Sequence, residues 1–143
     1  MSPSPADPQP RPTDRELEIL SVLWSRGEST VREVHETLAD QLGIGQTTVL
    51  KLMQIMVEKG LIMRDESVRP QRFTAAQPKA STQRQLIGDL VDRAFSGAAA
   101  PLVMEALAGG RVNEAERDRI RQMLDQLDAR DQDEARGANG GRS

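Results

Sequence analysis

The sequence predicts a mainly α-helical protein with one small β-hairpin. Apolar residues recur at helical spacing in three segments before the hairpin and in three more after it. The hairpin is expected from two short runs, 61–65 and 71–75, on either side of a turn at 66–70. Three short helices followed by a hairpin is the element order of a winged helix-turn-helix head. The later helices then form an arm.

Composition excludes several functional classes. The 143 residues suffice for one modest core and a helical extension, but not for two full-sized domains. The absence of cysteine excludes disulfides, thiolate metal sites and thiol nucleophiles, and the single histidine excludes a histidine-rich metal cluster. No metal or other cofactor is therefore expected. The net charge is -3 and the pI is about 5.3, so any contact with nucleic acid has to come from a local basic patch.

The two ends of the chain are expected to differ from its middle. Residues 1–12 contain five prolines, and residues 130–143 are polar and become rich in glycine, so both segments are expected to be disordered tails. Between them we expect a winged-helix domain at 13–79 and a helical dimerisation domain, the arm, at 80–129. The first residues are polar where a signal peptide would be apolar, so we expect a cytoplasmic protein without membrane insertion.

Sequence signals mark the ends of the helices in the head. Thr13 and Thr30 are each followed three residues later by glutamate, the capping-box pattern that begins a helix. The third helix is predicted at about 46–59, with Gly60 as a left-handed cap just after it. In the hairpin, Phe73 is the expected inward anchor.

The arm is predicted to mediate dimerisation. Its helices are amphipathic and contain almost no aromatic residues, so they make a poor core alone and bury their apolar stripes more fully against a second copy. The predicted interface residues are Leu86, Leu90, Phe95, Leu102, Val103, Leu107, Ile120, Met123, Leu124 and Leu127.

The third helix has two faces of different chemistry. Thr47, Lys51 and Gln54 share one side, opposite Val49 and Met53. Gln can pair with adenine, and Lys can reach guanine or phosphate, so this face suits the major groove of double-stranded DNA. The predicted DNA-binding residues of this helix are Gln46, Thr47, Thr48, Leu50, Lys51 and Gln54, with Leu50 offered to a thymine methyl group. The alternative is that the polar residues are only the solvated side of an amphipathic helix.

The hairpin adds a cluster of positive charge. Arg64, Arg69 and Arg72 lie within nine residues around its turn, where a wing would meet the DNA backbone or the minor groove. Such arginines are often only solubilising. Together with the third helix, however, they predict a localised basic patch.

Three segments resemble the penicillinase-repressor family, also called BlaI/MecI/CopY. They are PTDRELEILSVLW at 12–24, STVREV at 29–34 and TTVLKLMQIMVEKG at 47–60. The similarity continues through the hairpin and into 83–107. It implies a homodimer that binds an inverted repeat in promoter DNA through the third helix and the wing, represses transcription, and exchanges C-terminal helices between subunits.

The sequence departs from this family at three points. Many relatives have Arg where this chain has Ile55, so the phosphate or base contact of that arginine is not carried over to this chain. The resemblance implies a membrane sensor protease as a partner in the lactam-responsive branch. The segment 95–101 lacks the Asn-Phe bond that such a protease cuts, so this partner is unsupported. The copper-responsive branch uses paired cysteines, which are absent here.

Other functions remain as alternatives. No activated nucleophile or metal-ligand set is present, so we do not expect an enzyme. His35 is expected to be a surface or packing residue. A winged helix that binds protein rather than DNA would have more aromatic and apolar residues on the outer face of the third helix. A small-molecule-responsive repressor would need a pocket that sequence does not reveal.

Overall fold

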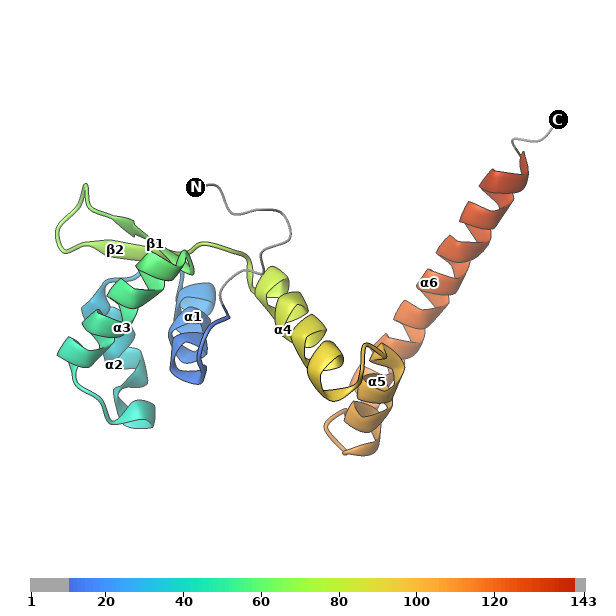
Figure 1. Ribbon diagram of the computed structural model, residues 1–143, viewed down its shortest axis with the longest axis horizontal. Coiled ribbons are helices and arrows are strands. Elements are labelled where there is room, and N and C mark those ends of the chain that lie inside the picture. The colour runs from blue at the N-terminus through green and yellow to red at the C-terminus, as the bar shows by residue number, and fades with distance from the viewer. Residues whose placement is uncertain (1–10, 141–143) are drawn as a thin grey trace. The chain divides into compact units, whose positions relative to one another are not determined.

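The computed structural model describes residues 11–140, and side chains are described through residue 138. The described chain divides into two compact units, the head unit through Asp89 and the C-terminal unit from Leu90. The described residues form six helices and one hairpin, which confirms the mainly α fold class with a small β-hairpin. Figure 1 shows these elements. The elements are α1 (Asp14–Arg26), α2 (Val31–Leu42), α3 (Gln46–Lys59), β1 (Ile62–Asp65), β2 (Arg72–Ala75), α4 (Lys79–Ala94), α5 (Ala99–Ala108) and α6 (Glu114–Gly140).

Local signals fix the ends of the helices in the head. The Thr13 and Thr30 side chains each accept the amide of the glutamate three residues later, so both predicted capping boxes form. Gly43 and Gly60 follow α2 and α3 with φ of 61° and 78°. Glycine adopts this left-handed conformation without steric cost, so each ends its helix and redirects the chain.

One apolar core holds α1, α2, α3 and the hairpin together. Side chains from all five elements contribute, and Phe73 of β2 lies among them with 1% exposure. The core residues are Ile19, Leu20, Val22, Leu23, Val34, Leu38, Val49, Met53, Met56, Ile62 and Phe73. Each helix therefore has one face that packs inward and one that faces solvent.

The hairpin is attached to the start of α2. Strands β1 and β2 are antiparallel, with Arg64 opposite Phe73 and Asp65 opposite Arg72. Phe73 also exchanges two backbone hydrogen bonds with Ser29, at 2.8 and 3.0 Å. Because Ser29 immediately precedes the capping residue of α2, the base of the wing (residues 61–75) is fixed to the helix-turn-helix.

An ion pair connects the beginning of α1 to the end of α3. The Lys59 ammonium donates to both carboxylate oxygens of Glu16, at 2.9 and 3.1 Å, and Glu16 is only 2% exposed. Glu16 also accepts the backbone amide of Thr13. Burial alone would raise the pKa of Glu16, but the bonds from Thr13 and Lys59 outweigh it, and the pKa is lowered.

The division between units lies within α4 rather than at the predicted boundary between residues 79 and 80. Pro12 and Thr82 are buried, and Arg11 forms an ion pair with Asp89 at 3.3 Å. Arg11 and Pro12 were expected in a disordered tail; this pair and the burial of Pro12 hold them against the head unit instead. The rest of that tail, 1–10, lies outside the described residues.

The C-terminal unit buries little of its own surface. Val91 is its only buried residue within the described range 90–138. Asn113 caps α6 through reciprocal hydrogen bonds with Glu116. The prediction of a disordered tail from residue 130 is wrong as far as Gly140, because α6 continues to that residue. Strong helix formers such as Arg130, Glu134 and Ala135 extend the helix although their side chains are exposed.

We predict that Glu16→Gln lowers the free energy of unfolding by about 1–3 kcal/mol at pH 7, because the variant loses a charge-assisted buried hydrogen bond. The pKa of Glu16 lies below its ordinary value of 4.5 in the folded chain. The contribution is therefore present above that ordinary value and is lost as pH falls through the lower folded-state pKa. Urea unfolding followed by circular dichroism should show a large difference from wild type at pH 7 and a small one at about pH 3.

The matched control is Glu36→Gln, which removes the same charge from an exposed pair with Arg32. It should change stability little. Equal losses in the two variants would contradict the role assigned to the Glu16–Lys59 pair.

Candidate nucleic-acid interface

The outer face of α3 exposes the polar residues that the sequence indicates. Val49, Met53 and Met56 have 0% exposure, so the opposite side of the helix faces solvent. All six predicted contact residues of this helix are exposed: Gln46, Thr47, Thr48, Leu50, Lys51 and Gln54. The side chain of Lys51 has no carboxylate within ion-pair distance among the described residues, so its charge is available to a ligand.

A hydrogen bond from α2 fixes the turn that leads into α3. The His35 ring nitrogen Nε2 donates to the carbonyl oxygen of Ile44 at 3.0 Å, which fixes the turn between the two helices. His35 therefore has the packing role expected from the sequence. Gly45, the N-cap of α3, supplies no side-chain acceptor to the first turn. The first amides of α3 are thus free of side-chain caps, as binding of a phosphate there would require.

A cleft joins the start of α3 to the wing. Gln46 and Arg69 both line it, together with residues 30–32 at the start of α2 and 70, 71 and 73 of the wing. Its volume is about 280 Å³. Two of the predicted contacts, one on the helix and one on the wing, therefore lie in the same cleft although they are 23 positions apart in sequence.

The structure separates the three wing arginines, which the sequence presents as one group. Arg64 forms an ion pair with Glu66 at 2.8 Å, and Arg72 lies 3.9 Å from a Glu33 carboxylate oxygen. Arg69 is exposed and has no ion pair among the described residues. The positive charge that the wing offers without rearrangement is therefore concentrated at Arg69.

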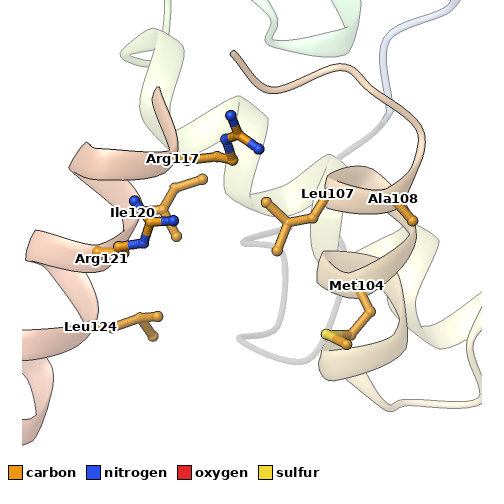
Figure 2. A pocket seen from close by; sticks show the side chains of 7 residues that line it. All are labelled: Met104, Leu107, Ala108, Arg117, Ile120, Arg121 and Leu124. Carbon is orange, nitrogen blue, oxygen red and sulfur yellow. The ribbon is translucent and has the colours of Figure 1, made fainter. Parts of the chain in front are cut away.

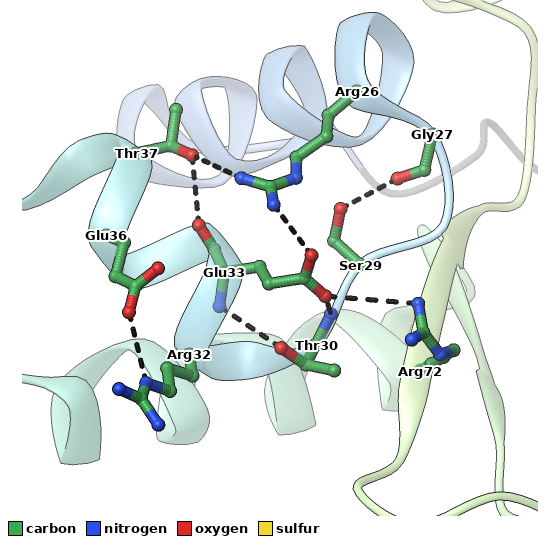
Figure 3. A network of polar contacts seen from close by, with 9 residues as sticks. All are labelled: Arg26, Gly27, Ser29, Thr30, Arg32, Glu33, Glu36, Thr37 and Arg72. Carbon is green, nitrogen blue, oxygen red and sulfur yellow. Dashed lines mark hydrogen bonds and ion pairs between the residues drawn. The ribbon is translucent and has the colours of Figure 1, made fainter.

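Glu33 connects three elements of the head, as Figure 3 shows. Its carboxylate accepts the Thr30 amide at 3.1 Å and the Arg26 guanidinium at 2.7 Å, and it faces Arg72 of β2. The bond from the Thr30 amide is the largest cause that lowers the pKa of Glu33, and Arg26 contributes further. The carboxylate thus stays charged near neutral pH and holds Arg72 beside α2.

Three residues near this surface were not among the predicted contacts. Ile55 is 37% exposed beside the polar face. Glu58 follows Gln54 by four residues and is exposed on the same side of α3, so helical periodicity could have revealed it. Arg32 lines the cleft, but this depends on the position of the wing, which α2 alone does not indicate.

The described part of the chain contains neither a candidate metal site nor a candidate membrane-spanning helix. Residues 11–138 contain no group of three or more His, Cys, Asp or Glu side chains placed to hold a metal ion. None of the described helices is both long and apolar enough to cross a membrane.

Comparison with known proteins identifies the family. Residues 12–126 match the sequence model of the penicillinase repressor family. The chain belongs to the penicillinase-repressor family. Membership confirms the resemblance seen in the three sequence segments. It makes this protein a DNA-binding transcriptional repressor rather than an enzyme.

The individual relatives that match have a low sequence identity to this chain. The transcriptional regulators BlaI from two strains of Mycobacterium tuberculosis, CDC 1551 / Oshkosh and ATCC 25618 / H37Rv, are each 28% identical to this penicillinase-repressor family member over 117 residues. The matches cover 81% of this chain and 84% of each relative. A MarR family regulator from Neisseria meningitidis is similar in structure, with a TM-score of 0.37 and 16% identity, over 86% of this chain and 78% of that chain.

We predict that Arg69→Ala weakens binding to duplex DNA of any sequence and reduces the steepness of log affinity against log salt by roughly 1 per subunit. Arg72→Ala should have a smaller effect, because Glu33 already holds Arg72. Fluorescence anisotropy titrations of labelled duplexes across a salt series measure both quantities. A loss of DNA affinity for Arg72→Ala as large as that for Arg69→Ala would contradict the conclusion that the available charge of the wing is concentrated at Arg69.

Proposed function

We propose that this protein is a homodimeric repressor that binds an inverted-repeat operator in double-stranded DNA through α3 and the wing. The observation that carries the proposal is the division of α3 into a fully buried apolar face and an exposed polar face with an unpaired Lys51. Hydroxyl, amide and ammonium groups on one exposed helix face are the groups that read base edges in the major groove. No aromatic residue lies on this face, which disfavours a protein partner there.

The proposed dimer interface is the C-terminal unit with the adjoining part of α4. Six of the ten predicted interface residues are exposed in one chain: Leu90, Val103, Leu107, Met123, Leu124 and Leu127. The other four are half-buried: Leu86, Phe95, Leu102 and Ile120. Exposed apolar stripes of this extent favour association. A second copy is the occupant that matches them, because a closed two-fold dimer buries the same stripe on both subunits.

The helices α5 and α6 form an open, mainly apolar groove, which Arg117 and Arg121 also line (Figure 2). Met104 and Leu107 of α5 face Ile120 and Leu124 of α6 across it, and its volume is about 470 Å³. Three of these four residues belong to the predicted dimer stripe. We therefore assign the groove to helices of the second copy rather than to a small ligand.

Selection of duplexes from a random pool tests the proposal. The enriched sequences should contain inverted half-sites about one helical turn, or a small multiple of it, apart. In the same selection, Gln54→Ala should relax preference at one base position in each half-site, at a cost of about 1–3 kcal/mol. Gln41→Ala, an exposed glutamine of α2 outside the predicted contacts, is the control and should select the wild-type sequence. An unchanged preference with Gln54→Ala would show that the groove assignment is wrong.

We predict that Leu124→Asp converts the dimer to a monomer. Leu124 is 56% exposed in one chain, so the change should leave the protomer folded and place a charge only in the dimer interface. Operator affinity should fall by roughly 10²- to 10⁴-fold, because two joined half-site contacts reinforce each other through effective concentration. Analytical ultracentrifugation measures the mass. Gln126→Asp, exposed on the same helix but outside the predicted stripe, should remain dimeric. A dimeric Leu124→Asp variant would refute this interface.

A further inference from the structure

We infer that Glu66 limits the affinity of this protein for DNA by occupying Arg64, a wing cation that could otherwise bind phosphate. The inference rests on the proposed function. It identifies Glu66 as a residue that sets the strength of backbone binding, and thereby the affinity for DNA of unrelated sequence.

The geometry of the wing brings the two residues together. Arg64 lies on β1 and Glu66 in the turn directly after the strand, and their charged groups are 2.8 Å apart. Between them, Asp65 accepts two hydrogen bonds from Ser67, one from the backbone amide at 2.9 Å and one from the hydroxyl. These bonds hold the backbone of the turn, so Glu66 stays within reach of Arg64 rather than swinging away.

The pair is open to solvent, where a phosphate can compete for the arginine. The side chain of Arg64 is 33% exposed and that of Glu66 is 63% exposed. Exposed ion pairs are weak because water screens them, so a phosphate oxygen can displace the carboxylate. Each phosphate contact through Arg64 must then first release Glu66, which reduces the net gain from that contact.

The rest of the wing shows that compensation of arginine is a repeated feature. Arg72 has Asp65 opposite it in the hairpin register and Glu33 at 3.9 Å. Arg69 is the wing arginine without an ion pair among the described residues. Binding to unrelated DNA depends on phosphate contacts, whereas base contacts supply discrimination. A wing with few available cations therefore keeps binding to unrelated sequences weak, while the base contacts of α3 are unaffected.

The test is Glu66→Gln in the full-length protein, measured by anisotropy on a selected operator duplex and on a scrambled duplex across a salt series. We expect the dissociation constant on both duplexes to fall about tenfold near 0.1 M salt. The slope of log affinity against log salt should become more negative by roughly 1 to 2 for a dimer, as Arg64 of each subunit gains a phosphate. Affinities within twofold of wild type, with an unchanged slope, would overturn the inference.

Two further variants separate the mechanism from simple changes in charge. Glu134→Gln, on the exposed end of α6, changes net charge equally and should leave both affinities within twofold of wild type. In an Arg64→Ala background, Glu66→Gln should no longer tighten binding. Tightening by Glu134→Gln, or tightening that persists without Arg64, would overturn the release of Arg64 as the cause. Failure of the wild type to bind any duplex at low salt would instead refute the proposed function itself.

Discussion

The burial of Val49, Met53 and Met56 is the constraint on which the rest of the head depends. With these three side chains fully buried, the opposite side of α3 has to face solvent, and Thr47, Lys51 and Gln54 lie there. The Glu16–Lys59 ion pair and the His35–Ile44 bond then hold the two ends of the helix. A binding surface is most effective when it is held rigid before it meets its ligand, and the apolar core gives that rigidity to the proposed DNA-binding face of α3.

The balance of charge follows from how the wing is anchored. Fixing β2 beside α2 brings Arg72 close to Glu33, and the tight turn brings Arg64 close to Glu66. The contacts that order the wing therefore also neutralise two of its three arginines. The chain as a whole also has a net charge of -3. For a protein of this charge, we expect selectivity to arise mainly from the proposed base contacts of α3 and the proposed pairing of half-sites, rather than from long-range attraction to DNA.

Local signals made most of the head predictable from sequence. The third helix was predicted at 46–59 and is observed at Gln46–Lys59, because glycine stands immediately before and after it. Both capping boxes form, and Phe73 is buried as expected.

The ion pair between Arg72 and Glu33 could not be predicted in the same way. The two residues are far apart in sequence and meet only because β2 is attached to Ser29. The contact between Arg11 and Asp89 of α4 is likewise tertiary and has no local sequence signal. At the C-terminus, the polarity of residues 130–140 indicated disorder, whereas their helix propensity extends α6.

We propose that a dimer of this protein recognises a specific duplex mainly through base contacts and binds the DNA backbone with few cations. Dissociation constants for a selected operator and its scrambled counterpart, measured across a salt series with wild-type protein, test this claim most directly. Lys51 and Arg69 of both subunits would neutralise about four phosphates, which predicts a slope of roughly -4. The operator should bind at least about 10³-fold more tightly than the scrambled duplex near physiological salt. Equal affinity for the two duplexes at every salt concentration would contradict the account.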